Sequence, residues 1–342
     1  MGKEDEVKRV SSHLAFLAAV AAAVALTAAE PTKALAAAPA KKVEWPDSSK
    51  TLTIINPNAA GGDVDTATRI LQPFLEKELG IKTVLLNKPG AGNQVGITGL
   101  VQAKPDGYTI GYTLLPTTIT IYLDPERKAV FSRKDIQPIA LHTSEPGVVA
   151  VRADGPYKSL KDLLDAAKAS PEKIRAGDAG ILNAGNLAIL QLQQAVGAKF
   201  AIVHFDGGAP LVTSVMGGHI DAAFTFAPMT LSYVKGGQLR LLAVNDTQRS
   251  KYYPDVPTLG ELGYKASFAA SSVRPLSAPA GTPREIVDII GSAIKRAMES
   301  EDYKKKMETA AMSARYMDAA QVVSMWTDME AEVKPLMSLA NK

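Results

Sequence analysis

Residues 51–80 read TLTIINPNAAGGDVDTATRILQPFLEKELG, a run that contains the signals for a strand, a glycine loop and a helix in succession. Residues 51–56 carry Leu52, Ile54 and Ile55 and predict a buried strand. Between residues 64 and 79 apolar side chains return at helical spacing, and Gly80 follows as a helix-ending residue. The predicted buried stripe of this helix consists of Ile70, Leu71, Phe74, Leu75 and Leu79.

The same unit recurs along the chain. A capping pair, Ser159 and Asp162, predicts the start of one of the later helices. The alternation of strands and helices predicts an α/β fold with mainly parallel sheets. Further strands are predicted over residues 83–86, 108–112, 148–151, 175–178, 201–204, 222–226 and 239–244.

The last third of the chain is predicted to be largely helical. Thr282, Pro283 and Glu285 have the spacing of a capping box with proline at the first helical position. A terminal helix is predicted to begin near Asp318 and Gln321. Its predicted buried residues are Val322, Met325, Met329, Val333 and Leu336.

Two α/β units in tandem indicate two lobes. We predict one lobe from residues 45–148 and 272–342 and the other from residues 149–271, with chain crossings near Val149 and Ser272 as a hinge. The tandem arrangement alone also fits a doubly wound enzyme with two domains.

Composition excludes several classes of protein. The 342 residues include 38 basic and 35 acidic side chains, and a net charge of +3 gives no indication of a nucleic-acid partner. Cysteine is absent, which excludes disulfides, thiolate catalysis and cysteine metal sites.

The N-terminus predicts export. Lys8 and Arg9 precede an apolar run over residues 14–29, and Ala34-Leu35-Ala36 offers a small-x-small cleavage site. The run is shorter than the roughly 20 residues that span a bilayer as a helix. We predict a signal peptide over residues 1–36 and a periplasmic location, with an uncleaved anchor or a disordered leader as alternatives.

Four loops carry the predicted chemistry: residues 58–62, 90–93, 179–183 and 206–209 each join a strand to a helix. Open α/β sheets bind ligands beyond the carboxyl ends of their strands, and helix starts hold anions through unpaired N–H groups. Glycine at such a turn also serves simple chain reversal, so one loop alone fits a structural role. Together, the loops predict an anion-binding cleft between the lobes.

The predicted ligand-binding residues come from these loops and from neighbouring strand ends and helix starts. They are Asn58, Ala59, Ala60, Gly61, Gly62, Asp65, Ala91, Gly92, Asn93, Leu115, Thr117, Ala179, Gly180, Asn183, Asp206, Gly207, Ala209 and Thr225.

Nucleotide and catalytic motifs are missing from the sequence. Gly61-Gly62 lacks the lysine and hydroxyl residue of a P-loop, and the spacing of Gly90, Gly92 and Gly96 is one residue longer than the dinucleotide fingerprint. There is no Gly-x-Ser-x-Gly elbow and no histidine spacing typical of a metal site. His204, beside the fourth loop, fits either a ligand contact or a packed strand end. We predict no catalytic residue, no metal and no cofactor.

Read together, the loops and the motifs between them resemble the extracytoplasmic receptors of the tripartite tricarboxylate transporters, the TctC or Bug family. The similarity runs from about residue 51 to residue 337. It is carried by Asn58–Gly62 with Asp65 and Arg69, and by NKPGAGN at 87–93, AKPDGYT at 103–109, GGAP at 207–210, GGHID at 217–221, PDVPT at 254–258, ELG at 261–263 and APAGTP at 278–283.

The resemblance implies a two-lobed periplasmic-binding-protein fold of the Venus-flytrap, type II-like kind, with two chain crossings. It also implies a monomer without a cofactor that delivers a small organic carboxylate to a two-subunit membrane permease. In such proteins the first two loops hold the proximal carboxylate, a role that carries over to Ala59, Ala60, Gly61, Gly62, Ala91 and Gly92.

This sequence departs from the family where specificity is set. Asn58 stands where the family has an aromatic residue, Asn93 stands where it has glycine, and residues 179–183 differ from its usual Gly-Ser loop. The acid bound therefore does not follow from the relatives. A sensor for a membrane kinase, or a hydrolase using the same cleft, are the alternative functions.

Overall fold

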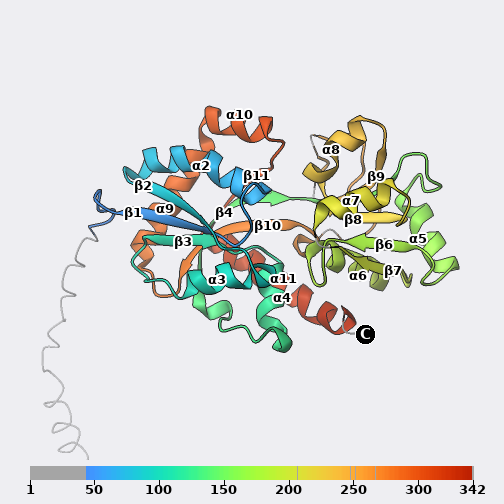
Figure 1. Ribbon diagram of the computed structural model, residues 1–342, viewed down its shortest axis with the longest axis horizontal. Coiled ribbons are helices and arrows are strands. Elements are labelled where there is room, and N and C mark those ends of the chain that lie inside the picture. The colour runs from blue at the N-terminus through green and yellow to red at the C-terminus, as the bar shows by residue number, and fades with distance from the viewer. Residues whose placement is uncertain (1–43, 206, 247, 251, 266, 341–342) are drawn as a thin grey trace, which may run out of the picture. The chain divides into compact units, whose positions relative to one another are not determined.

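The computed structural model describes residues 44–340 except residues 206, 247, 251 and 266, and its strands form two sheets (Figure 1). The predicted signal peptide lies outside the described residues. The first sheet has the order β11-β4-β10-β3-β1-β2, and the second has the order β7-β6-β8-β5-β9. The strands of the first are β1 (Thr51–Asn56), β2 (Lys82–Asn87), β3 (Thr109–Tyr112), β4 (Ile136–Glu145), β10 (Ser272–Pro279) and β11 (Ala314–Asp318). Those of the second are β5 (Gly147–Arg152), β6 (Arg175–Asp178), β7 (Ala201–His204), β8 (Ala222–Phe226) and β9 (Leu239–Asn245).

The chain passes from the first sheet to the second at Pro146, between β4 and β5. It returns between β9 and β10, in the stretch from Asn245 to Ser272. The first passage lies slightly ahead of the predicted crossing at Val149, because β4 continues as far as Glu145. The assignment of whole segments to two lobes stays a prediction.

Both sheets are mixed, so the prediction of mainly parallel sheets was wrong. Strand β1 pairs with β2 and β3 in parallel, but β10 pairs antiparallel with both β3 and β4. In the second sheet β5 likewise runs antiparallel to β8 and β9. The antiparallel strands include those that flank the crossings, where the chain leaves one sheet and later returns to it.

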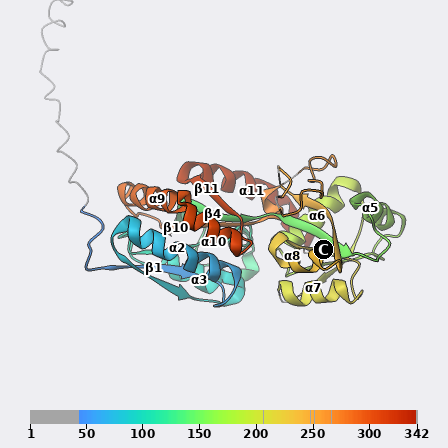
Figure 2. The same cartoon turned by 90° about the horizontal axis from the view of Figure 1, so that it is seen from above.

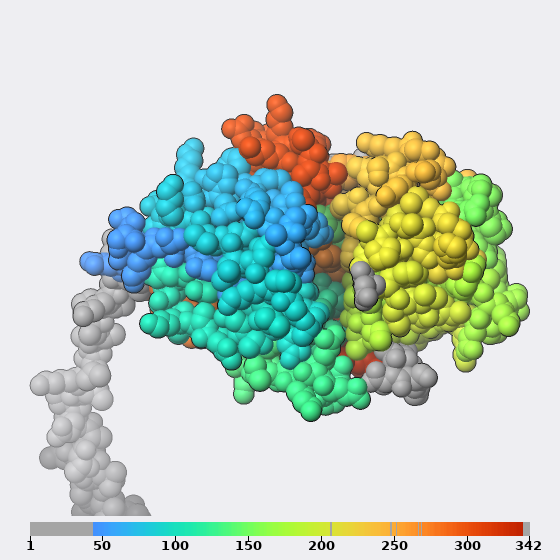
Figure 3. All heavy atoms as spheres, viewed as in Figure 1, coloured from blue at the N-terminus to red at the C-terminus, as the bar shows by residue number. Residues whose placement is uncertain are grey.

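The surface of the described part of the chain is hollowed along a groove between the segments of the two sheets (Figure 3). Blue-to-cyan atoms, from the segments around β1, α2 and β2, form one wall of this groove. Yellow atoms, from the segments around α7 and β8, form the other wall.

Most predicted helices are present, and one predicted cap is absent. Ser159 and Asp162 form the capping box at the start of α5, as predicted. The box at Thr282 was wrong: its hydroxyl donates to the carbonyl of Pro279, and no side chain caps α9. The helices are α2 (Asp63–Leu79), α3 (Gln94–Val101), α4 (Thr117–Leu123), α5 (Leu160–Ala169), α6 (Ala184–Val196), α7 (Gly208–Met216), α8 (Ala227–Lys235), α9 (Arg284–Glu299), α10 (Glu301–Thr309) and α11 (Ala319–Ala340).

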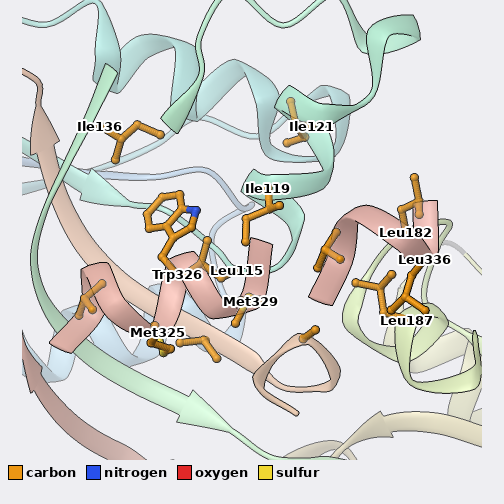
Figure 4. Packing of buried hydrophobic residues seen from close by; sticks show 14 of the residues in the cluster. Leu115, Ile119, Ile121, Ile136, Leu182, Leu187, Met325, Trp326, Met329 and Leu336 are labelled. Carbon is orange, nitrogen blue, oxygen red and sulfur yellow. The ribbon is translucent and has the colours of Figure 1, made fainter. Parts of the chain in front are cut away.

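The terminal helix α11 packs beside β4 and reaches α6, which follows a strand of the second sheet (Figure 2). Its five predicted inward residues are all buried. Trp326 packs near Leu115 (Figure 4). Farther along the helix, Leu336 lies beside Leu182 and Leu187, which belong to the loop after β6 and to α6. One hydrophobic cluster therefore connects elements of both sheets.

Candidate functional site

The first loop joins β1 to α2 and is tied down by the carboxylate of Asp65. Ala59, Ala60, Gly61 and Gly62 are exposed, whereas Asp65 is buried. One oxygen of Asp65 accepts the N–H of Gly61 at 3.1 Å and the Nε of Arg69 at 2.9 Å. The N–H of Gly61 and the carboxylate of Asp65 are therefore engaged in hydrogen bonds inside the protein.

The other oxygen of Asp65 connects this loop to the next strand. Asn87, the last residue of β2, donates its amide to Asp65 Oδ1 at 2.9 Å. The hydrogen bond from Arg69, helped by those from Asn87 and Gly61, holds the pKa of Asp65 at about 2, well below its usual range, although burial opposes this. Asp65 is thus a permanent anion that fixes two strand ends. Asn58 is half-buried, and its N–H donates to the side chain of Asn56.

The second loop has an uncommon backbone. Gly90, Ala91, Gly92 and Asn93 have φ values of 135°, 46°, 57° and 81°, so four successive residues lie at positive φ. Only glycine adopts this region without strain, and Ala91 and Asn93 are held there by their surroundings. Such strain is concentrated at functional sites in proteins. Helix α3 begins directly afterwards, at Gln94.

Arg127 lies against this loop, a contact that the sequence does not predict. Its Nη1 donates to the carbonyl of Ala91 at 3.1 Å, and a Cβ added to Gly92 would lie 3.3 Å from the same nitrogen. Gln94 in turn donates to the carbonyl of Arg127 at 3.1 Å. Arg127 ends a short 3-10 turn, Pro125–Arg127, and no motif or spacing in the sequence connects it with residues 90–93.

Residues after β3 are more deeply placed than the sequence suggests. Leu115 is 2% exposed, and its N–H and C=O both pair with Val273 of β10, at 2.8 and 3.1 Å. Leu115 is thus a core residue whose backbone is already bonded. Thr117, the first residue of α4, is half-buried.

The third loop has its own anchoring carboxylate, Asp178, the last residue of β6. Its Oδ1 accepts the N–H of Gly180 at 2.8 Å, and its Oδ2 accepts the side chain of Asn186 at 3.0 Å. Burial raises the pKa of the Asp178 carboxyl, while the hydrogen bonds from His204, Gly180 and Asn186 act to lower it.

The remaining residues of this loop are held by the start of α6. Asn186 also accepts the N–H of Leu182 at 3.0 Å, and Asn183 caps the helix by accepting the N–H of Asn186 at 2.9 Å. Ala179, Gly180 and Asn183 are half-buried. The loop therefore presents a fixed shape at the end of β6.

The fourth loop begins after His204, the last residue of β7. Asp206 lies outside the described residues. Gly207 has a φ of 104°, and a Cβ at Gly208 would lie 2.6 Å from the Cε of Met229, so α7 starts against that methionine. Ala209 is exposed. Thr225 of β8 is 4% exposed and faces a small cavity of 20 Å³ that Gly185 and Asn245 also line.

Strand direction brings these loops together in two groups. Because β1, β2 and β3 are parallel, the first two loops and residue 115 leave the first sheet at one edge. Because β6 is parallel to β7 and β8, the third and fourth loops and Thr225 leave the second sheet at one edge. Segments that carry loops of both groups border the groove of Figure 3.

Larger cavities in the described part of the chain are lined by none of the predicted site residues. One of 280 Å³ is lined by residues of α6, α11 and the segment before β10, one of 400 Å³ mainly by residues of α11, and one of 780 Å³ by residues of α9, α10, β11 and the segment after β9. Within the part of the chain that the structure describes, no group of three or more histidines and carboxylates is arranged to hold a metal ion. Of the helices in the described ranges, none combines the length and the apolar character needed to cross a bilayer.

Comparison with known proteins identifies relatives over most of the chain. Residues 67–341 match the sequence model of a protein family described as "Tripartite tricarboxylate transporter family receptor". A protein of Cupriavidus necator, "UPF0065 protein in gbd 5'region", is 30% identical over 301 residues, which cover 86% of this chain and 89% of that protein.

Solved structures share the fold. A TctC solute binding protein from Polaromonas, without ligand, has a TM-score of 0.72 at 27% identity and covers 85% of this chain and 98% of its own. The structure of the periplasmic binding protein BugD has a TM-score of 0.68 at 25% identity. The match covers 85% of this chain and 98% of the BugD chain. The predicted similarity to this family and the predicted α/β, two-lobed fold are therefore confirmed.

Proposed function

Because this chain belongs to the tripartite tricarboxylate transporter receptor family, we propose that it captures a small organic carboxylate in the groove between its sheets and delivers it to a two-subunit membrane permease of that transporter type. The family consists of periplasmic solute-binding receptors. The loops support a carboxylate ligand, and the transporter type of the family supports a permease partner.

The matched anchoring of two loops supports an anionic ligand most directly. Asp65 of α2, the helix after β1, and Asp178 of β6 in the second sheet each accept the N–H of a loop glycine and a side chain from another segment. Each anchored loop then leads into a helix start, α2 or α6. Helix starts carry partial positive charge, so fixing them at the groove prepares the site for an anion.

The strained second loop supports the same ligand. At the end of this loop Asn93 is left-handed and Gln94 right-handed, and such a pair turns successive backbone N–H groups toward one side, an arrangement that binds anions in other proteins. Charge-assisted hydrogen bonds contribute about 1.5–3 kcal/mol each, and micromolar binding requires about 8 kcal/mol. A few amides from each side of the groove are sufficient for that affinity.

The proposal extends to the rest of the molecule. Residues 1–36 act as a signal peptide that directs a monomer to the periplasm, and the passages at Pro146 and between Asn245 and Ser272 act as the hinge between two lobes. The protein acts without catalysis, metal or cofactor. Closure of the lobes over the acid removes it from water and strengthens each hydrogen bond.

Thermal unfolding with small carboxylates and the matching amides tests the proposal. Carboxylates are expected to raise the melting temperature and amides of the same carbon skeleton are not, because only the anion gains from helix-start charge. Small-angle scattering is expected to show compaction with the acids that stabilise. Equal shifts from acid and amide would contradict an anion site, and unchanged scattering would contradict closure.

A further inference from the structure

The guanidinium of Arg127 is bound to one peptide group of the second loop. Its Nη1 donates to the carbonyl of Ala91 at 3.1 Å, and the backbone N–H of Gln94 donates to the same oxygen. A Cβ added to Gly92 would lie 3.3 and 3.4 Å from Nη1 and Nη2, so the guanidinium lies directly against the backbone of this glycine. Two donors from different segments therefore hold the Ala91 carbonyl in one direction.

The same peptide group has an unpaired donor at its other end. The peptide bond between Ala91 and Gly92 is trans, so its C=O and its N–H point in opposite directions. In the part of the chain that the structure describes, no hydrogen-bond partner is recorded for the N–H of Gly92, and this residue is exposed. By fixing the carbonyl, Arg127 therefore fixes the direction of a free N–H of the second loop.

The backbone around this peptide needs such support. Ala91 has a φ of 46°, a region that residues with a Cβ rarely adopt. Rotation of Ala91 back to negative φ would turn the whole peptide, and the N–H of Gly92 with it. The hydrogen bond from Arg127 opposes that rotation.

Arg127 is itself held beside the loop by its backbone. The side chain of Gln94 donates to the carbonyl of Arg127 at 3.1 Å, a bond that does not depend on the side chain of Arg127. With the other described residues, no ion pair is recorded for Arg127. Its charge therefore acts on the Ala91 carbonyl without a neighbouring carboxylate to offset it, and a polarised C=O makes the N–H of the same peptide a stronger donor.

We propose that Arg127 is a positioning residue of the carboxylate site: it holds the Ala91–Gly92 peptide so that the N–H of Gly92 faces the groove and donates to the acid. The inference rests on the proposed function, because the acid is the one captured in that groove. Arg127 acts through this peptide and does not touch the acid. The N–H of Gly61 in the first loop is already engaged by Asp65, which makes the free donor of the second loop more important.

Calorimetry on the exported protein and its variants measures this role. Butyrate, benzoate, succinate and citrate are the probes, and the acid that the wild type binds most tightly is used for every variant. Arg127→Met removes the donor and the charge, and it is expected to weaken binding about tenfold. Arg127→Lys keeps a charged donor that can reach the Ala91 carbonyl, and it is expected to bind within about threefold of the wild type.

Lys128→Met is the matched control. It removes the same charge from the next residue, which is exposed and has no recorded contact with the described residues of the second loop. Its affinity is expected to stay within about twofold of the wild type. Melting temperatures of all variants show whether any fold is disturbed.

Nuclear magnetic resonance separates positioning from a merely structural role. Isotope labels on alanine carbonyls and glycine nitrogens select the amides of glycines that follow alanine, which include Gly61 and Gly92. In the wild type, saturating acid is expected to move the amide proton of Gly92 downfield, because this N–H gains a charged acceptor. In saturated Arg127→Met that shift is expected to be largely lost, while the amide of Gly61 keeps its wild-type position.

The outcomes separate this inference from the proposed function. Wild-type affinity in Arg127→Met, or a Gly92 shift that persists in that variant, would overturn the inference and leave a carboxylate receptor in place. Equal weakening by Arg127→Lys and Arg127→Met, or by Lys128→Met and Arg127→Met, would overturn it too. If the wild type binds none of these acids, the proposed function fails, and this inference fails with it.

Discussion

Asn87 donates its side-chain amide to Asp65 at 2.9 Å and so connects the end of β2 to the first turn of α2. The two residues are far apart in sequence and hold the first two loops at a common edge. The same carboxylate accepts the N–H of Gly61, so a single buried anion sets the position of one loop and the strand that precedes the other. Its removal is therefore expected to affect both stability and binding.

Asp65→Asn is expected to lower the free energy of unfolding by about 1–3 kcal/mol, because Gly61, Arg69 and Asn87 lose a buried, charged acceptor. Carboxylate affinity is expected to fall with it. In the wild type the contribution of ionised Asp65 to the free energy of unfolding is fully present above 3.8, the pKa of the unfolded chain. It is lost as pH falls toward 2. Urea unfolding and calorimetry measure the two effects.

The matched control is Asp165→Asn, which breaks another helix pair, Lys161–Asp165, whose side chains are 79% and 53% exposed. Its expected change in stability is below about 0.5 kcal/mol. Similar losses in both variants would mean that Asp65 is an ordinary surface partner.

Gly61→Val is expected to abolish carboxylate binding, since a branched side chain enters the space beside the first loop. The φ of Gly61 is 81° and no atom lies within 4 Å of an added Cβ, so the stability loss comes from backbone strain, about 1–2 kcal/mol. Gly237→Val shares a positive φ of 68° and open space, but it lies in the turn after α8. Calorimetry is expected to find binding intact in that control. Retained affinity in Gly61→Val would remove the first loop from the site.

His142 is expected to make stability fall in acid. It is fully buried between Tyr112 and Tyr303, with 2.8 Å hydrogen bonds on both ring nitrogens, and burial lowers its pKa to about 3. The unfolded chain binds this proton near pH 6.5, so stability is lost as pH falls below that value toward 3.

His142→Gln removes this titration. Between pH 7 and pH 4.5 its unfolding free energy is expected to change by about 2 kcal/mol less than that of the wild type. Chemical denaturation at several pH values measures the two profiles. Parallel profiles would show that His142 does not contribute to the acid sensitivity.

Leu336→Ala is expected to reduce the unfolding free energy by about 2–4 kcal/mol, because a 2% exposed side chain leaves a cavity. Leu336 lies beside Leu182 of the third loop (Figure 4), so ligand affinity is expected to fall as well. Val323→Ala, on the same helix and 42% exposed, is the control, with an expected change below about 0.5 kcal/mol. Urea titrations that place the two variants at equal stability would contradict the role of α11 in supporting that loop.

Local pattern was sufficient for the first β-loop-α unit. The predicted bounds of β1, β6, β7 and β8 match the structure. Strands β1, β7 and β8 are short, mainly apolar runs, the pattern that predicts a strand locally. In α2, Leu71, Leu75 and Leu79 are buried as predicted, while Ile70 and Phe74 are half-buried at the border of the stripe.

Strands that depend on distant partners were missed. Pro275 interrupts the apolar run of β10, and the structure accommodates it at a shift in register between Arg274 and Pro275. Strand β4 contains Pro138 and was missed for the same reason. The two strands are stabilised by pairing with each other over eight residues. The local sequence of either segment does not predict that pairing.

The sequence by itself determined the family, the α/β class and the positions of four glycine loops, because glycine, proline and apolar spacing act on neighbouring residues. Tertiary structure alone decided that Asp65 and Asp178 anchor two of the loops, that Arg127 lies on a third, and that the ring of His204 is held on a buried carboxylate. Those contacts join residues from different strands and turns. Their energies depend on distances that arise only when the sheets have formed.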